Sequence, residues 1–231
     1  MQQLPLGVRL RDRAVFESFL PARNDEALAH ARRAAAGHGG LTWLAGPSGA
    51  GKTHLLQAVC AAAALARRSG YLPLRELSGL GVEVLAGLPQ LDCLAVDDVD
   101  TVIGRAEWER ALFTLVREFA ERDRALVLAS GAPPALACWA LPDLGSRCAA
   151  AAVFQLRVLD EPEQREALRL RARLRGLDLP PDTARWLQRR FPRDMGTLYQ
   201  LLDTLDEAAL AAQRRLTVPF IREVLARVAP R

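Results

Sequence analysis

Short apolar runs alternate with amphipathic segments over the first two thirds of the chain. Five runs have the length and composition of buried strands, at 41–45, 71–74, 92–98, 125–130 and 152–156. Apolar residues at helical spacing predict helices at 25–36, 54–68 and 106–122, the first with Asn24 as its N-cap. Strands that alternate with helices predict an α/β domain with a parallel five-stranded sheet covered on both faces.

From Asp160 onward the pattern predicts helices only. Asp160 and Glu163 form a D-x-x-E capping box, which predicts a helix that runs to Arg175 and ends at Gly176. Three more helices are predicted to begin near Pro181, Met195 and Thr217. We therefore expect a tail at 1–12, an α/β domain at 13–159 and a small all-α lid domain at 160–231.

The eight residues after the first predicted strand fit the phosphate-loop pattern G-x-x-x-x-G-K-[ST] at every position. They are Gly46, Pro47, Ser48, Gly49, Ala50, Gly51, Lys52 and Thr53. Glycines let the backbone turn tightly and aim its N–H groups at phosphate oxygens, and the helix that follows adds its dipole. In this pattern Lys52 reaches the β- and γ-phosphates, and the Thr53 hydroxyl holds Mg²⁺. We predict that the loop and His54, which follows it, bind ADP or ATP.

Two carboxylates end the third predicted strand, about 40 residues after the loop, which is the spacing that the fold needs. Asp97 is predicted to bind Mg²⁺ together with Thr53. Asp98 is predicted to orient or polarise the attacking water. Strands often end in Asp, so the spacing from the loop carries this interpretation.

The chain has an unusual ratio of arginine to lysine. Of its 31 basic residues, 30 are arginines and one is a lysine, Lys52. A general preference for arginine should also have replaced this lysine, unless arginine cannot perform the function of Lys52. A compact ammonium fits between phosphates where a planar guanidinium does not. The net charge of +4 permits contact with nucleic acid without arguing for it. The arginines at 165, 169, 171, 173 and 175 are predicted to form a solvated face.

Signals for membranes, secretion and disulfides are weak in this sequence. It has no run of 18 uncharged apolar residues and no charged-then-apolar leader at its start, so we expect a cytoplasmic protein without a membrane partner. Cys60, Cys93, Cys138 and Cys148 lack C-x-x-C spacing and a nearby histidine cluster. Buried, reduced thiols are therefore predicted.

The phosphate loop, the Asp-Asp strand end, a late Ser-Arg pair and a helical lid together resemble the AAA+ class. Three segments are similar to the Hda family of DnaA-related proteins, namely Leu141–Arg147, Leu168–Gly176 and Ala212–Phe220. The resemblance implies an ADP-bound negative regulator of chromosome replication initiation, with weak or no ATPase of its own, that inactivates DnaA by stimulating hydrolysis of DnaA-bound ATP. The helix-turn-helix domain of DnaA has no counterpart in this sequence, so we expect no sequence-specific DNA binding.

The resemblance also assigns roles outside the chain's own phosphate loop. The segment Gln3-Leu4-Pro5-Leu6 resembles the Q-L-x-L tail that docks on the DNA polymerase sliding clamp, which makes Gln3, Leu4 and Leu6 clamp-binding residues. From its pattern alone, the segment would be expected to be a frayed tail. Arg147 resembles the arginine finger, which acts in trans on a partner's nucleotide. A homo-oligomer is left open.

The chain departs from the family pattern at two sensor positions. Ser130-Gly131 stands where the family often has Asp, and Gly196 stands where the second sensor is usually Arg. Arg193 is the candidate to bind nucleotide in place of that second sensor. These departures predict weak hydrolysis at the chain's own site. Two alternatives stay open, an autonomous P-loop ATPase or phosphotransferase and an AAA+ helicase loader.

Overall fold

The structure is a computed structural model that describes residues 14–191, 195–212 and 216–228. The chain divides into two compact units, with the division between Val158 and Leu159. The predicted clamp-binding residues Gln3, Leu4 and Leu6 lie outside the described residues, as does Arg193. Among the described helices, none combines the length and apolar character needed to cross a membrane.

The first unit is built on a five-stranded sheet in which all neighbouring strands are parallel. The strands are β1 (Gly40–Ala45), β2 (Ser69–Pro73), β3 (Cys93–Asp97), β4 (Ala125–Ser130) and β5 (Ala152–Gln155). Their order is β2-β3-β4-β1-β5. The predicted parallel five-stranded sheet is therefore confirmed. Because the strands are parallel, the loop after β1 and the carboxylates after β3 lie at the same edge of the sheet.

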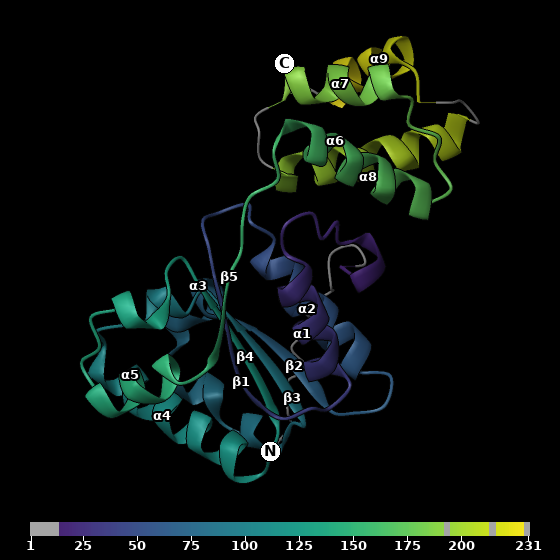
Figure 1. Cartoon of the computed structure of the whole chain (residues 1–231). Coiled ribbons are helices and arrows are strands. Elements are labelled where there is room, and N and C mark those ends of the chain that lie inside the picture. The colour runs from purple at the N-terminus through teal and green to yellow at the C-terminus, as the bar shows by residue number, and fades with distance from the viewer. Residues whose placement is uncertain (1–13, 192–194, 213–215, 229–231) are drawn as a thin grey trace. The chain divides into compact units, whose positions relative to one another are not determined.

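Helices cover both faces of this sheet (Figure 1). They are α1 (Asp25–Ala35), α2 (Lys52–Ala63), α3 (Leu74–Leu77), α4 (Ala106–Glu121) and α5 (Pro142–Ala149). In β1, Leu44 belongs to the core that α1 and α2 cover, while Trp43 and Ala45 belong to the core that α4 and α5 cover. Burial on both faces explains why the strands are continuous apolar runs in the sequence.

The start of α1 differs from the prediction. Asn24 occupies the N-cap position, but its side chain makes no capping hydrogen bond. Asn24 Oδ1 instead accepts the N–H of Arg157 at 2.8 Å, and Asn24 Nδ2 donates to the carbonyl of Arg157 at 3.0 Å. The buried Asn24 amide thus ties the start of α1 to the segment that follows β5.

The second unit is helical, as predicted. Its helices are α6 (Glu161–Leu174), α7 (Pro181–Arg190), α8 (Met195–Ala212) and α9 (Val218–Val228). The predicted capping box is present at the start of α6, where Asp160 Oδ1 accepts the Glu163 N–H at 2.9 Å and Glu163 Oε2 accepts the Asp160 N–H at 2.7 Å. Apolar side chains from all four helices form the core of the unit, among them Leu168, Leu187, Leu202 and Ile221.

The prediction of a solvated arginine face is wrong for Arg171 and Arg175, whereas Arg169 and Arg173 keep 40 % and 66 % of their side chains exposed. Arg171 is only 8 % exposed, and its guanidinium lies 4.1 Å from the ring centroid of Tyr199. Arg175, just after α6, forms an ion pair with Asp203 of α8. Long aliphatic stems let Arg171 and Arg175 line the interior of the lid while their charged guanidinium groups reach Tyr199 and Asp203.

The cysteines agree with the prediction at three positions. Cys60, Cys93 and Cys148 are buried and all four thiols are free, but Cys138 is exposed. Cys138 follows the short helical turn Pro134–Leu136 and lies outside the sheet and the helices that cover it. The prediction of a buried thiol is therefore wrong for Cys138.

Candidate nucleotide-binding site

The phosphate-loop segment contains two turns that favour glycine. Gly49 and Gly51 have φ angles of +78° and +92°, in the left-handed region that strains residues with a side chain. A Cβ on Gly51 would also lie 2.8 Å from Cε2 of Phe19. Because α2 begins directly after Gly51, the backbone N–H groups of its first turn face the loop. This geometry suits a bound anion.

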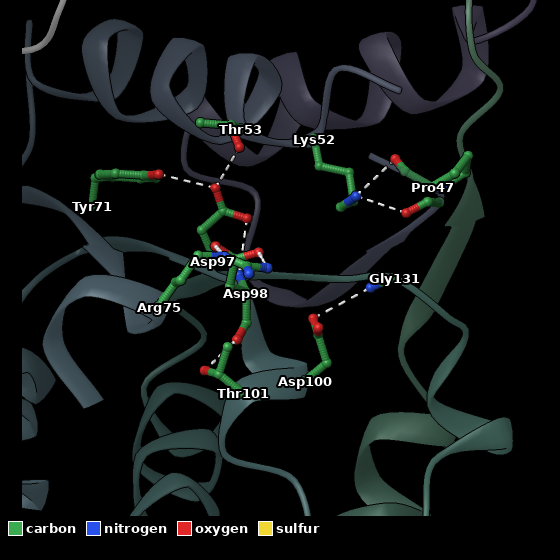
Figure 2. Close-up of polar contacts among 11 residues, drawn as sticks. Pro47, Lys52, Thr53, Tyr71, Arg75, Asp97, Asp98, Asp100, Thr101 and Gly131 are labelled. Carbon is green, nitrogen blue, oxygen red and sulfur yellow. Dashed lines mark hydrogen bonds and ion pairs between the residues drawn. The ribbon is translucent and has the colours of Figure 1, made fainter. Parts of the chain in front are cut away.

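Lys52 folds back over the loop. Its Nζ donates to the carbonyl of Gly46 at 2.7 Å and to the carbonyl of Pro47 at 3.0 Å (Figure 2). Pro47, Ser48 and Gly49 are exposed, so this part of the loop is open to solvent. The structure therefore places a positive charge at an accessible turn of backbone.

Asp97 is the centre of a hydrogen-bond network at the end of β3. Its Oδ2 accepts the Thr53 hydroxyl at 2.6 Å and the Tyr71 hydroxyl at 2.9 Å, and its Oδ1 accepts the N–H of Asp98 at 3.0 Å (Figure 2). Asp97 is 2 % exposed. Burial raises the pKa of this carboxyl, and the hydrogen bonds from Thr53 and Tyr71 oppose the rise. The structure thus brings together the two predicted magnesium ligands.

These two side chains fit Mg²⁺. The Thr53 hydroxyl and the Asp97 carboxylate are hard oxygen ligands in direct contact, and Thr53 follows the loop lysine in the sequence. Protein sites commonly bind Mg²⁺ through one or two such groups and complete its coordination with water and substrate phosphates. When bound, the ion neutralises phosphate charge.

Asp98, the residue predicted to polarise water, is held by Arg75. Nε and Nη2 of Arg75 each donate to a different oxygen of Asp98, both at 2.9 Å (Figure 2). Asp98 has a φ of +54°, and its carbonyl accepts the Thr101 hydroxyl at 2.7 Å. Two residues further on, Asp100 Oδ1 accepts the N–H of Gly131 at 3.3 Å. Asp100 therefore brings a carboxylate to the end of β4, where the sequence has Ser-Gly.

His54 connects α2 to the segment before α1. Its Nε2 lies 3.1 Å from the Ser18 hydroxyl and 3.1 Å from the carbonyl of Val15, and its ring packs edge-on against Phe19. The imidazole therefore lies against residues 15–19. A contact of His54 with a cofactor, as predicted, would come from its backbone in the first turn of α2.

Arg147 lies on α5, on the opposite face of the sheet from α2. Leu144 and Cys148 of the same helix are buried in the core under α4 and α5, whereas Arg147 is exposed. Its guanidinium lies 5.1 Å from the ring centroid of Phe113 on α4. The aromatic ring supports this arginine at the surface through a cation–π contact.

Sequence reasoning missed Tyr71 and Arg75 as members of the site. In the sheet, Pro73 of β2 pairs with Asp97 of β3. Tyr71 and Arg75 each lie two residues from Pro73, which brings both next to the carboxylates of β3. The only signal that would have found them is the pairing of β2 with β3, which no local pattern contains.

The architecture is that of solved AAA+ proteins. Domain III of the replication initiation protein DnaA from Thermotoga maritima matches with a TM-score of 0.74 at 21 % identity, over 94 % of this chain and 98 % of that chain. The Holliday junction branch migration motor RuvB of the same organism matches with a TM-score of 0.60 at 16 % identity, over 89 % of this chain and 69 % of that chain. With its parallel sheet and helical second unit, the chain has the fold of these AAA+ proteins.

The second unit matches a family model. Residues 160–225 match the family model for the lid domain of Hda. The AMPPCP-bound DnaA from Aquifex aeolicus also matches, with a TM-score of 0.66 at 20 % identity, over 83 % of this chain and 65 % of that chain. The second unit is thus similar to the lid domain of Hda, the fold of the chain is that of DnaA domain III, and the Hda resemblance seen in the sequence is confirmed over residues 160–225.

Proposed function

We propose that this chain is a nucleotide-bound regulator of replication initiation that stimulates the hydrolysis of ATP bound to DnaA. The observation that carries the proposal is the match of residues 160–225 to the Hda lid, in a chain whose fold is that of DnaA domain III. The segment Leu141–Arg147, which resembles the same family, adds an exposed arginine able to act on a partner.

The chain's own site supports binding of ADP or ATP with Mg²⁺. Lys52 and the first turn of α2 supply positive charge and N–H donors for phosphates. Thr53 and Asp97 supply the oxygen ligands for Mg²⁺. A DnaA of this fold was solved with AMPPCP. By its resemblance to the Hda family, we propose that the active form of this chain holds ADP.

The surroundings of Asp98 support slow hydrolysis at this site. A carboxylate polarises water best when its negative charge is not compensated, and here Arg75 donates to both of its oxygens. A site that keeps its nucleotide suits a protein that acts as a switch. We therefore propose that turnover by this chain alone is weak.

Arg147 is the residue that we propose acts on DnaA. It is exposed and rests on Phe113, so it is available to a neighbouring molecule. A guanidinium brought to a transferring phosphoryl group stabilises its developing charge. In other nucleotide hydrolases such an arginine is worth about 10³–10⁵ in rate.

The second proposed partner is the sliding clamp on DNA. Gln3, Leu4 and Leu6 carry this proposal through their resemblance to the Q-L-x-L tail. An extended segment of this kind docks through alternate side chains in apolar pockets. Docking would bring the chain and DnaA together on the same DNA.

The test measures hydrolysis of ATP pre-bound to DnaA, with this protein, ADP and DNA-loaded clamp. We expect stimulation that depends on the clamp and that falls by a factor of about 10³ or more in Arg147→Ala. Arg117→Ala is the matched control, because Arg117 is an exposed arginine of α4 that pairs with Glu121. A variant with alanine at Gln3, Leu4 and Leu6 should lose the clamp dependence.

The outcomes separate the alternatives. Full stimulation by Arg147→Ala would show that Arg147 does not act as an arginine finger. Steady ATP turnover by the isolated protein, without an effect on DnaA, would favour an autonomous ATPase. Binding to a replicative helicase in place of the clamp would favour a helicase loader.

A further inference from the structure

Tyr71 lies beside the magnesium ligands but belongs neither to the phosphate loop nor to the acidic strand end. It is a residue of β2, and its register partner in β3 is Ala95, two residues before Asp97. The Tyr71 side chain extends toward the end of β3, where its hydroxyl donates to Asp97 Oδ2 at 2.9 Å (Figure 2). The neighbouring strand thus supplies a donor to the metal-binding carboxylate.

Two hydroxyls share one oxygen of that carboxylate. Thr53 and Tyr71 both donate to Asp97 Oδ2, and the N–H of Asp98 donates to Oδ1. These three donors come from three different segments and fix the orientation of both oxygens. Because Asp97 is buried, water cannot readily replace a donor that is removed.

The Tyr71 phenol is suited to this task. A phenol keeps its proton at neutral pH, so the Tyr71 hydroxyl is a donor to Asp97. The same Asp97 oxygen also accepts from Thr53 of α2, so the Tyr71 hydroxyl meets the carboxylate at the point where α2 and β3 come together.

We propose that Tyr71 is a positioning residue for Mg²⁺, which holds the Asp97 carboxylate in the orientation in which it and Thr53 bind the ion. The proposal rests on the proposed nucleotide binding, but it does not require DnaA or the clamp. Groups that hydrogen-bond to metal ligands commonly change metal affinity by about 10–100-fold. A phenylalanine at this position keeps the ring and removes only the donor.

The experiment measures ADP binding to the full chain by calorimetry, in EDTA and over a series of Mg²⁺ concentrations. In Tyr71→Phe, the strengthening of ADP binding by Mg²⁺ should fall by about tenfold or more. ADP affinity in EDTA should match that of the wild type, and circular dichroism should show the wild-type fold at the assay temperature. Tyr199→Phe is the matched control, since Tyr199 is the other tyrosine of the chain and lies on α8 of the second unit. This control should keep the full effect of Mg²⁺.

A double variant sharpens the test. Since both hydroxyls act on one oxygen, Thr53→Ala combined with Tyr71→Phe should lose little more Mg²⁺ effect than Thr53→Ala alone. Losses that simply multiply would overturn the shared action. A Tyr71→Phe protein with the full Mg²⁺ effect would overturn the role of Tyr71 alone. A wild type that binds no ADP under either condition would overturn the proposed nucleotide site as well.

Discussion

Arg75 donates two hydrogen bonds to Asp98, one to each carboxylate oxygen and each 2.9 Å long. This paired geometry is the favourable one between arginine and a carboxylate. The Arg75 side chain is 66 % exposed, so solvent screens the pair and it contributes little to stability. The main effect of Arg75 is to compensate the negative charge of Asp98, at the edge of the sheet where Lys52 and Asp97 also lie.

Removing Arg75 should release Asp98 to act on water. In Arg75→Ala we expect single-turnover hydrolysis of ATP by the chain itself to rise about two- to fivefold, because an exposed ion pair is weak. Arg68→Ala is the control, since Arg68 pairs with Asp92 just before the start of β3. Adding Asp98→Asn should cancel the gain. Unchanged turnover in Arg75→Ala would show that the ion pair does not limit hydrolysis.

Lys52 should not be replaceable by arginine. Lys52→Ala and Lys52→Arg should both lower ADP affinity by about tenfold or more, because the ammonium contributes charge-assisted hydrogen bonds in a tight turn that a planar fork does not fit. Titration of a fluorescent ADP analogue measures the loss, and circular dichroism checks that the fold is kept. Wild-type affinity in Lys52→Arg would contradict the argument from the single lysine.

Asn24 should matter for stability although it is distant from the phosphate loop in the sequence. Asn24→Ala leaves the N–H and carbonyl of Arg157 without their amide partner, and should lower the free energy of unfolding by about 1–3 kcal/mol. Urea denaturation measures the change. Asp25→Ala at the adjacent exposed position should change it by only about 0.5 kcal/mol. Equal losses in both variants would mean that the Arg157 contact is not the cause.

The four thiols should react very differently in the native chain. Burial raises the pKa of Cys93 to about 11 and that of Cys148 to about 12, and also raises the pKa of Cys60, while Cys138 is exposed. Since the thiolate is the reactive form, maleimide at pH 8 should label Cys138 first. Mass spectrometry should find one label in the native protein and none in Cys138→Ser. Rapid labelling at more than one position would place the buried thiols nearer to solvent than the structure does.

Local patterns were enough to predict the sheet and to place the residues at the centre of the candidate site together. Apolar runs marked the strands, and the spacing of Lys52, Thr53 and Asp97 placed a phosphate loop and a carboxylate at one edge of a parallel sheet. The structure brings Thr53 and Asp97 into contact, because consecutive β–α units direct the ends of their strands the same way.

Pairings between distant segments were beyond local patterns. Asn24 and Arg157 are separated by 133 positions, so a good N-cap residue was assigned a local role that it does not have. Arginine usually lies at the protein surface, yet the side chain of Arg171 on α6 packs against the ring of Tyr199. In both cases a tertiary partner decides the position of a polar side chain that local propensity places elsewhere.

Lys52, which lies across the phosphate loop, also allows the loop to be modified or cleaved selectively. No other ε-amino group exists in the chain, so amine acylation has a single side-chain target. A lysine-specific protease likewise has one peptide bond to cut, between Lys52 and Thr53 in the first turn of α2. Both reactions require the Lys52 side chain to leave the carbonyls of Gly46 and Pro47, and a bound phosphate would occupy it. The extent to which Lys52 resists acylation and cleavage therefore measures how much of the site is occupied by nucleotide, in the wild-type protein and without a label.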